Sequence, residues 1–135
     1  MTEHNHAVVW MDHHEARVFH FNADDVDRLV VRPHDPHVHV HHKANSIGSG
    51  HAAEDQKFLH AVVEALGHSR AVLITGPGMA KTALVKHIAA HDPAVMERLA
   101  GVETVDQPTD AALVAHARAY FKAADRTTAQ KQKPG

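Results

Sequence analysis

The hydrophobic spacing of this chain changes near residue 52, and this change constrains the fold more than any other feature. Before it, the apolar run at residues 7–11 and the β-branched and aromatic run at residues 17–21 flank a polar turn. Two such runs around a short polar turn predict a β-hairpin. A second polar turn at residues 22–25 leads to residues 29–31, which a histidine-rich stretch follows. The first third of the chain therefore predicts three strands in a meander.

Beyond residue 52, helical spacing alternates with short apolar runs. One apolar stripe predicts a helix over residues 52–66, and Gly67 stands where its C-cap belongs. The apolar run at residues 71–75 is typical of a buried parallel strand. The remaining predicted elements are a helix at 79–90, a helical turn from Asp92 to Leu99 that Gly101 ends, a strand at 102–105, and a helix at 109–124 capped by Thr109.

This order of elements, β-β-β-α-β-α-β-α, predicts an α/β fold. Two strand-helix-strand crossovers after an antiparallel meander give a mixed five-stranded sheet with helices on its faces, as in the ribonuclease H-like fold. The length of 135 residues is the usual size of one domain. We expect that single domain at residues 1–124 and a disordered polar tail at residues 125–135.

Composition and charge exclude several classes of protein. The chain has no cysteine, which excludes disulfides, thiolate zinc sites and a cysteine nucleophile. It has 14 Lys and Arg against 16 Asp and Glu, so it lacks the strong basicity of many nucleic-acid-binding proteins. Its 16 histidines can add positive charge near neutral pH. No signal peptide or apolar segment of membrane-spanning length is visible, so we expect a cytoplasmic protein without a membrane partner.

Two enzymatic interpretations fail on particular residues. A nuclease of this fold needs several carboxylates around two metal ions. Asp12 is one candidate, but the strand at residues 71–75 leads into Gly76 and Pro77 without a second acid, so Asp12 is interpreted as a turn residue. The turn before Lys81 resembles a phosphate loop but lacks two of its required glycines. Lys81 at a helix N-terminus remains suited to one RNA phosphate.

A histidine-rich strand offers the alternative of metal chemistry. His37, His39 and His41 alternate, which places their imidazoles on one face of a strand at a spacing that suits a three-histidine metal site. No carboxylate at an obvious spacing supports them. We expect no stoichiometric metal at these residues and no cofactor. A small His-dependent metal-binding protein or hydrolase stays as the alternative function.

The linear pattern resembles the middle domain of the archaeal and eukaryotic class-1 peptide release factor and Pelota family. The hairpin that begins with residues 7–12 carries the resemblance, as do the basic strand end at residues 41–43 and the helix at residues 58–65. Residues 72–81 match most specifically, with an apolar strand, a Gly-Pro-Gly turn and a lysine. The resemblance covers residues 7–124 and implies a ribonuclease H-like fold that binds the ribosome.

Peptide release in that family depends on a Gly-Gly-Gln loop, and this chain departs from it. The matching residues 47–51 are Ile-Gly-Ser-Gly-His, with neither adjacent glycines nor glutamine. The resemblance therefore implies a non-catalytic ribosome-associated translation protein, comparable to relatives without the glutamine that act on stalled or hibernating ribosomes. An adaptor that binds only protein is a further alternative.

The residues expected to contact rRNA lie mainly in the glycine-containing segment before the first helix. Basic, hydroxyl and amide side chains there suit phosphates and sugars, whereas no DNA partner is expected and the oligomeric state stays open. The expected RNA-binding residues are His41, His42, Lys43, Asn45, Ser46, Gly48, Ser49, Gly50, His51 and Lys81.

Overall fold

The computed structural model describes residues 6–33 and 49–132. Its strands are β1 (His6–Met11), β2 (Ala16–Phe21), β3 (Val26–Val31), β4 (Ala71–Gly76) and β5 (Leu99–Thr104). Its helices are α1 (Ser49–Leu66), α2 (Ala80–His91), α3 (Pro93–Met96) and α4 (Asp110–Gln132). None of these described helices has the length and apolar character needed to cross a membrane.

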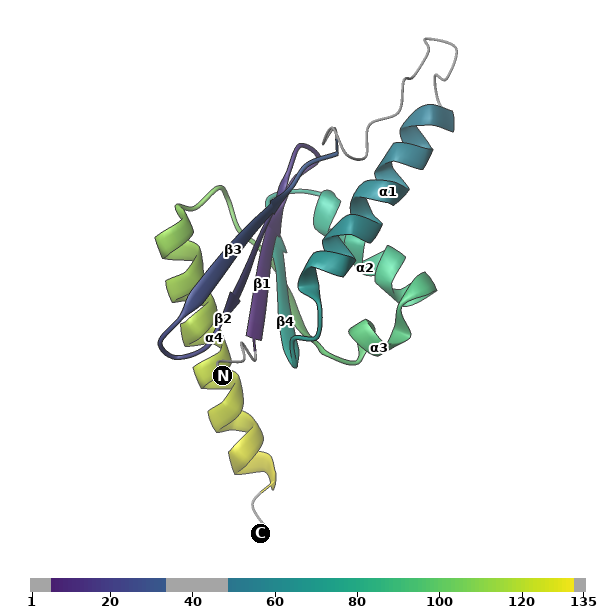
Figure 1. Cartoon of the computed structure of the whole chain (residues 1–135). Coiled ribbons are helices and arrows are strands. Elements are labelled where there is room, and N and C mark those ends of the chain that lie inside the picture. Colours follow the sequence, from purple (N-terminus) through teal and green to yellow (C-terminus); the bar gives the residue numbers. More distant parts are fainter. Residues whose placement is uncertain (1–5, 34–48, 133–135) are drawn as a thin grey trace.

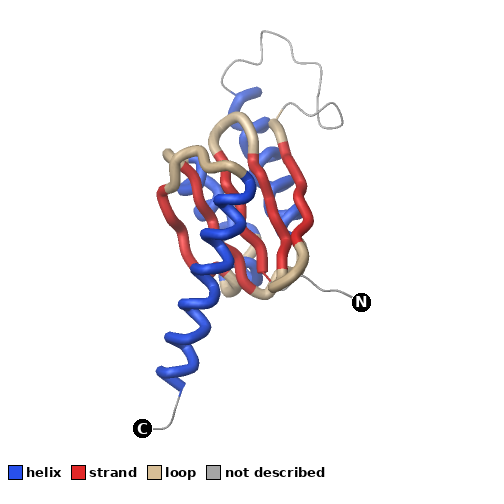
Figure 2. Tube along the Cα trace, turned by 90° about the vertical axis from the view of Figure 1, so that its left-hand side faces the viewer, coloured by secondary structure: helices blue, strands red, loops and turns tan. Residues whose placement is uncertain are grey.

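The strands described form one mixed sheet in the order β3-β2-β1-β4-β5. β1, β2 and β3 pair antiparallel, whereas β4 pairs parallel to β1 and β5 parallel to β4. Helices α1, α2 and α3 cover one face, and α4 lies across the other (Figures 1 and 2). The predicted α/β class and the five-stranded mixed sheet are confirmed.

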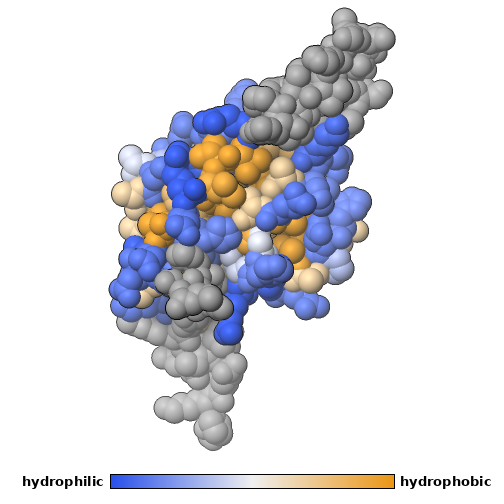
Figure 3. All heavy atoms as spheres, in the orientation of Figure 1, coloured by the Kyte–Doolittle hydropathy of each residue, from blue (hydrophilic) through white to orange (hydrophobic). Residues whose placement is uncertain are grey.

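Alternation along the strands divides the core between these two faces. Val9 of β1 packs toward α1 and α2, while its neighbours Val8 and Trp10 pack toward α4. Successive side chains of a strand point to opposite sides, so a strand covered on both faces must be apolar at every position. This requirement explains the continuous apolar runs in β1 and β4. The edge strand β3 is less covered: Val26 is 45% and Leu29 47% exposed, and apolar surface is visible from that side in Figure 3.

Each hairpin turn is closed by one side chain that accepts two backbone hydrogen bonds. Asp12 Oδ1 accepts from the amides of His14 and Glu15 at 2.8 and 2.9 Å. Asn22 Oδ1 accepts from the amides of Asp24 and Asp25 at 2.9 and 2.8 Å. Such bonds mimic a backbone turn. Asp12 therefore has the turn role that the sequence indicated.

Several element boundaries differ from the predicted ones. α1 begins at Ser49 rather than near residue 52, and β3 begins at Val26 rather than at residue 29. The helical turn after Asp92 ends at Met96, and β5 already begins at Leu99. Gly101 lies inside β5, so the prediction that it ends a helical turn is wrong.

The glycine at position 101 is required by side-chain packing and not by a turn of the backbone. A Cβ atom on this residue would overlap the Tyr120 hydroxyl, which donates a hydrogen bond to the Ala100 carbonyl at 3.0 Å. The glycine makes room for a side chain of α4. Gly67, by contrast, has φ of 60° directly after α1, which confirms its predicted role as a helix C-cap.

The expected disordered tail is the largest correction to the predicted elements. The structure continues α4 to Gln132, so residues 125–132 are helical, and only residues 133–135 of the tail lie outside the described chain. Residues 125–132 include Arg, Ala, Gln and Lys, which are strong helix formers. The first helix-breaking residue after the apolar face is Pro134.

Candidate functional site

One end of the sheet collects the segments that the sequence marks as functional. β1, β4 and β5 are parallel, so their carboxyl ends meet there, and β3 also ends there beside the start of β2. We call this the carboxyl end of the sheet. Helices α1, α2 and α4 begin at this end, and α1 projects beyond the strands (Figure 1). Ligands of α/β proteins bind most often outside the carboxyl ends of parallel strands.

The predicted RNA-binding residues divide into three groups. His41, His42, Lys43, Asn45, Ser46 and Gly48 lie outside the described residues, as do His37 and His39. Ser49, Gly50 and His51 form the start of α1, so the expectation that they precede the first helix was wrong. Serine is favoured at a helix start, and the strong helix formers Ala52, Ala53 and Glu54 follow shortly after it. These residues together favour a helix that begins closer to the N-terminus than predicted. Lys81 lies in the first turn of α2.

The turn that carries Lys81 is fixed against the end of β1. A Cβ atom on Gly76 would overlap the carbonyl oxygen of Met11, so only glycine allows this close approach between β4 and β1. The next residues, Pro77 and Gly78, are exposed and lead into α2. The Lys81 ammonium donates to the Gly78 carbonyl at 2.7 Å. The packing of Gly76 thus holds the start of α2 at the carboxyl end of the sheet.

The arginines near this end are already paired with carboxylates. Asp110 accepts from Arg17 at 2.6 Å and pairs with Arg28 at 2.8 Å. Arg32 lies 3.4 Å from Glu15. Among the described residues, Lys81 has no carboxylate within 4.0 Å, and its hydrogen-bond partner is the neutral carbonyl of Gly78. Lys81 therefore keeps a charge that an anionic ligand can neutralise, while Glu15 and Asp110 are occupied by arginines rather than arranged around a metal.

A second region was missed by the sequence analysis. An open pocket of about 740 Å³ lies between α1 and the segment formed by α2 and α3, and its polar lining includes Gln56, His60, Glu64, His87, His91 and Asp92. His87 and His91 are one helical turn apart on α2, which places them on one face. The four-residue spacing of His87 and His91 can be seen in the sequence. The packing of α1 against α2, which brings His60 to the same pocket, cannot be seen there.

His87 is the most buried polar side chain of this pocket, with 8% of its surface exposed. Its Nδ1 lies 2.8 Å from the amide oxygen of Gln56. Because that oxygen can only accept, Nδ1 carries the proton and Nε2 carries the free lone pair. Burial lowers the pKa of His87 and the nearby His91 and His60 lower it further, although Asp92 acts in the opposite direction. The imidazole is therefore neutral at neutral pH.

Comparison with known proteins gives matches at the level of structure. No protein-family model matches the chain, and no curated protein matches its sequence. Archaeoglobus fulgidus Pelota superposes with a TM-score of 0.59 at 12% identity, over 87% of this chain and 31% of that one. Thermoplasma acidophilum Pelota gives 0.50 at 18% identity, over 81% and 30%. The archaeal translation termination factor aRF1 gives 0.51 at 12% identity, over 95% and 42%.

These similarities concern part of each larger protein, because the chain spans about a third of the Pelota chains and 42% of aRF1. The TM-scores of 0.50 to 0.59 indicate a shared fold, and with identities of only 12 to 18% the similarity extends no further than the fold. The resemblance inferred from residues 72–81 and the preceding strands is confirmed at that level: the chain has the fold of a Pelota and release-factor domain.

Proposed function

We propose that this protein is a non-catalytic translation protein that binds rRNA of the ribosome through the carboxyl end of the sheet. The aRF1 structure that shares its fold is described as a translation termination factor. The supporting observation in this chain is that α2, with Lys81 in its first turn, begins at the same end at which β3 stops and α1 starts. The segment that carries most of the proposed contacts, residues 34–48, connects β3 to α1.

The start of α2 is chemically suited to a phosphate. Met79 occupies the N-cap position and makes no side-chain cap hydrogen bond, so no side chain competes at that position for the first amides of the helix. These amides and the positive end of the helix dipole favour an anion. Lys81 adds a full positive charge within the same turn. A single RNA phosphate matches both features.

The remaining proposed contacts come from the segment before α1 and from its first turn. His41, His42 and Lys43 supply cationic or donor groups, and Asn45 and Ser46 supply hydrogen-bonding groups for sugars and phosphates. Gly48, Ser49, Gly50 and His51 complete the set.

Peptide release is not part of the proposal. Residues 47–51 contain no Gly-Gly-Gln, and residues 49–51 lie in α1. Without the glutamine, occupancy of a ribosomal cavity would not be followed by hydrolysis. Binding to stalled or hibernating ribosomes is the role that fits a domain of this kind.

A ribosome pelleting titration tests the proposal. The wild-type protein is compared with Lys81→Ala, Lys43→Ala and a deletion of residues 48–50 at several salt concentrations. Each lost phosphate contact should weaken binding and reduce the slope of log affinity against log salt by about one unit or less. The matched control is Lys86→Ala, because Lys86 is exposed on α2 but lies beyond its first turn. Its binding should equal that of the wild type.

The same titration is run with ribosomes from growing and from starved cells. Stronger binding to one of the two identifies the ribosomal state that the protein recognises. If the wild type fails to pellet with either, the proposed function is wrong. If Lys81→Ala, Lys43→Ala and the deletion all bind as Lys86→Ala does, the carboxyl end of the sheet is not the contact.

A further inference from the structure

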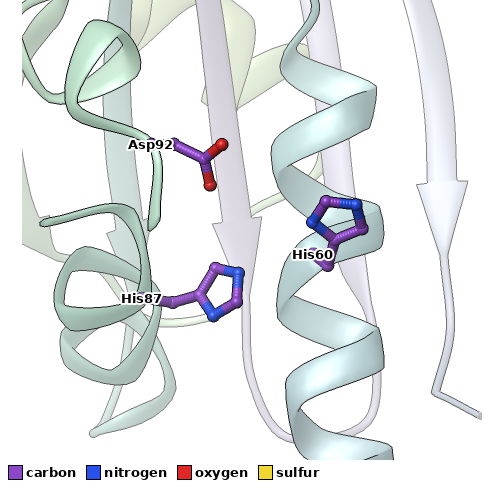
Figure 4. A group of neighbouring side chains, drawn as sticks. All are labelled: His60, His87 and Asp92. Atoms are coloured by element: carbon purple, nitrogen blue, oxygen red, sulfur yellow. The ribbon is translucent and has the colours of Figure 1, made fainter. Parts of the chain in front are cut away.

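Three side chains from separate parts of the chain converge at the pocket between α1 and α2. His60 belongs to α1, His87 to the second half of α2, and Asp92 to the junction between α2 and α3. One potential ligand atom from each lies within 4.8 Å of those of the other two. Figure 4 shows the two imidazoles and the carboxylate facing a common space. The arrangement is a tertiary one, since α1 and α2 must pack together to form it.

Two of these side chains have polar atoms that the fold leaves unpartnered. His87 Nε2 and Asp92 Oδ2 are buried and have no hydrogen-bond partner among the described residues. An unmade hydrogen bond at a buried polar atom costs about 1–3 kcal/mol. Both atoms are electron-pair donors, because His87 Nδ1 holds the ring proton. Because neither atom carries a hydrogen, the two cannot form a hydrogen bond with each other. A cation between them can accept a lone pair from each.

We infer that His60, His87 and Asp92 bind a divalent transition metal ion, with zinc as the best-fitting member of that class. Imidazole nitrogen and carboxylate oxygen are established zinc ligands, and two nitrogens among three ligands disfavour magnesium and calcium, which prefer oxygen. The proposed ribosome contact lies at the carboxyl end of the sheet and uses none of these residues.

The geometry requires only a small closure around the ion. Zinc–nitrogen and zinc–oxygen bonds of about 2.0–2.2 Å place tetrahedral ligand atoms roughly 3.3–3.6 Å from one another. In the structure the three candidate ligand atoms lie within 4.8 Å of one another. The His60 side chain is 58% exposed and can rotate toward the other two, whereas His87 is held by burial. The open side of the pocket leaves the fourth position to water.

Neighbouring side chains support the ligands. The Gln56 amide oxygen accepts from His87 Nδ1 at 2.8 Å, which fixes the ring orientation and the tautomer with a free Nε2. Glu64 lies 3.5 Å from His60 Nε2 and adds a carboxylate near the proposed ion. Such outer partners commonly change metal affinity by about 10–100-fold when they are removed. Gln56 is thus assigned as a positioning residue, not as a ligand.

Calorimetric titration of zinc chloride into untagged, chelator-treated protein tests the inference. We expect one zinc ion per chain in the wild type, and a cobalt-loaded sample should show the visible absorption of a low-coordinate site. His60→Gln and Asp92→Asn should each weaken binding by more than about 100-fold, since a lost ligand costs more than a lost outer partner. Gln56→Ala should weaken it by about 10-fold or more. Circular dichroism confirms that each variant is folded; His60 is exposed, so His60→Gln should fold normally.

The chain also supplies a matched control, because its other histidines can bind metal weakly. The triple variant His37→Gln, His39→Gln and His41→Gln should keep the stoichiometric site with unchanged affinity. If the triple variant loses the ion while His60→Gln and Asp92→Asn keep it, the inference is wrong. An absence of stoichiometric zinc binding by the wild type also overturns it. Ribosome pelleting of His60→Gln should equal that of the wild type, so the failure of either proposal can be told apart from failure of the other.

Discussion

The two faces of the sheet are closed in different ways. A single helix, α4, covers the face that carries Trp10, Phe19 and Phe21, and apolar residues of α4 complete that cluster. The opposite face is covered by α1, α2 and α3 together, with a larger apolar cluster beneath them. On the α4 face, a pocket of about 420 Å³ lies between that helix and the strands β2 and β3. On the opposite face, the helices lie side by side and leave a junction between them. The pocket with His87 and Asp92 lies at this junction.

Polar groups on the α4 face serve to close it. Trp10 Nε1 donates to the carbonyls of Val105 and Asp106 at 3.2 and 3.1 Å. The Arg17 guanidinium stacks 4.7 Å over the Trp10 ring and pairs with Asp110. Arg17 Nε lacks a hydrogen bond but lies 3.9 Å from Glu15 Oε2. These contacts join β1, β2 and the start of α4.

Two histidines on the face covered by α1, α2 and α3 differ in their hydrogen-bond partners. His20 bonds through both ring nitrogens, to the Ser69 hydroxyl at 3.0 Å and to the Ala65 carbonyl at 2.6 Å. His87 bonds through one nitrogen and leaves the other facing the pocket. His20 is therefore structural, and His87 is available to a ligand. In a chain with 16 histidines, this count of partners separates the two roles better than spacing does.

The largest effect should come from opening the α4 face. Trp10→Ala removes a side chain that is 1% exposed, so it should lower the free energy of unfolding by about 3–5 kcal/mol. Urea denaturation measures the change. His13→Ala in the exposed β1–β2 turn is the control and should alter stability by less than about 0.5 kcal/mol. A loss below about 1 kcal/mol for Trp10→Ala would show that this face is not rigidly closed.

A smaller loss should follow when the charge that holds the same face is removed. Asp110→Asn leaves the buried Arg17 guanidinium without its carboxylate, while the half-exposed Arg28 regains water. Because Asp110 is itself 41% exposed, we expect a loss of about 1–2 kcal/mol in urea denaturation rather than the larger cost of a fully buried pair. Arg28→Met should cost less than about 1 kcal/mol. If the two variants lose the same free energy of unfolding, the burial of Arg17 does not strengthen its ion pair with Asp110.

Gly101→Ala should cost about 1 kcal/mol, because the new methyl group displaces the Tyr120 hydroxyl from the Ala100 carbonyl. Thermal unfolding measures this loss in the wild-type background and again with Tyr120→Phe. The phenylalanine lacks the hydroxyl that the methyl group would meet, so the cost of Gly101→Ala should fall in that background. If Gly101→Ala costs the same stability in both backgrounds, the cost arises within strand β5 and not from the contact with the Tyr120 hydroxyl.

The smallest stability change is expected at the pocket. In metal-free protein, His87→Leu should leave the free energy of unfolding unchanged or raise it by up to about 1 kcal/mol, because it removes a buried atom without a partner. Wild-type protein should gain up to about 2.7 kcal/mol when zinc is present at 100 times its dissociation constant, and His87→Leu should gain nothing. Denaturation with and without zinc measures both. A loss above about 2 kcal/mol without metal would give His87 a structural role like that of His20.

The sequence predicted the elements whose pattern reflects burial on both sides. β1 and β4 are continuous apolar runs because helices cover both faces, and the order of crossovers then determined the sheet. Gly101 was misassigned because its cause, the Tyr120 hydroxyl, comes from a helix far along the chain. Ser49 lies in α1 rather than before it, because the strong helix formers Ala52, Ala53 and Glu54 outweigh the local effect of Gly50.

The candidate sites were less predictable. Lys81 was identified because its turn, strand and helix are contiguous in sequence. The grouping of His60, His87 and Asp92 depends on the packing of α1 against α2, and no local pattern encodes that packing. The regular alternation of His37, His39 and His41 drew attention to metal chemistry in a different part of the chain.

The direction of α4 decides how this protein can be handled in an experiment. α4 runs from the carboxyl end of the sheet past its opposite end, where β1 also begins (Figure 1). Labels or surface anchors attached near either His6 or Gln132 would therefore stand on the side away from Lys81. Fluorophores, affinity handles and immobilisation linkers at these positions should leave the proposed rRNA contact accessible, so tethered binding measurements can be made without redesigning the chain.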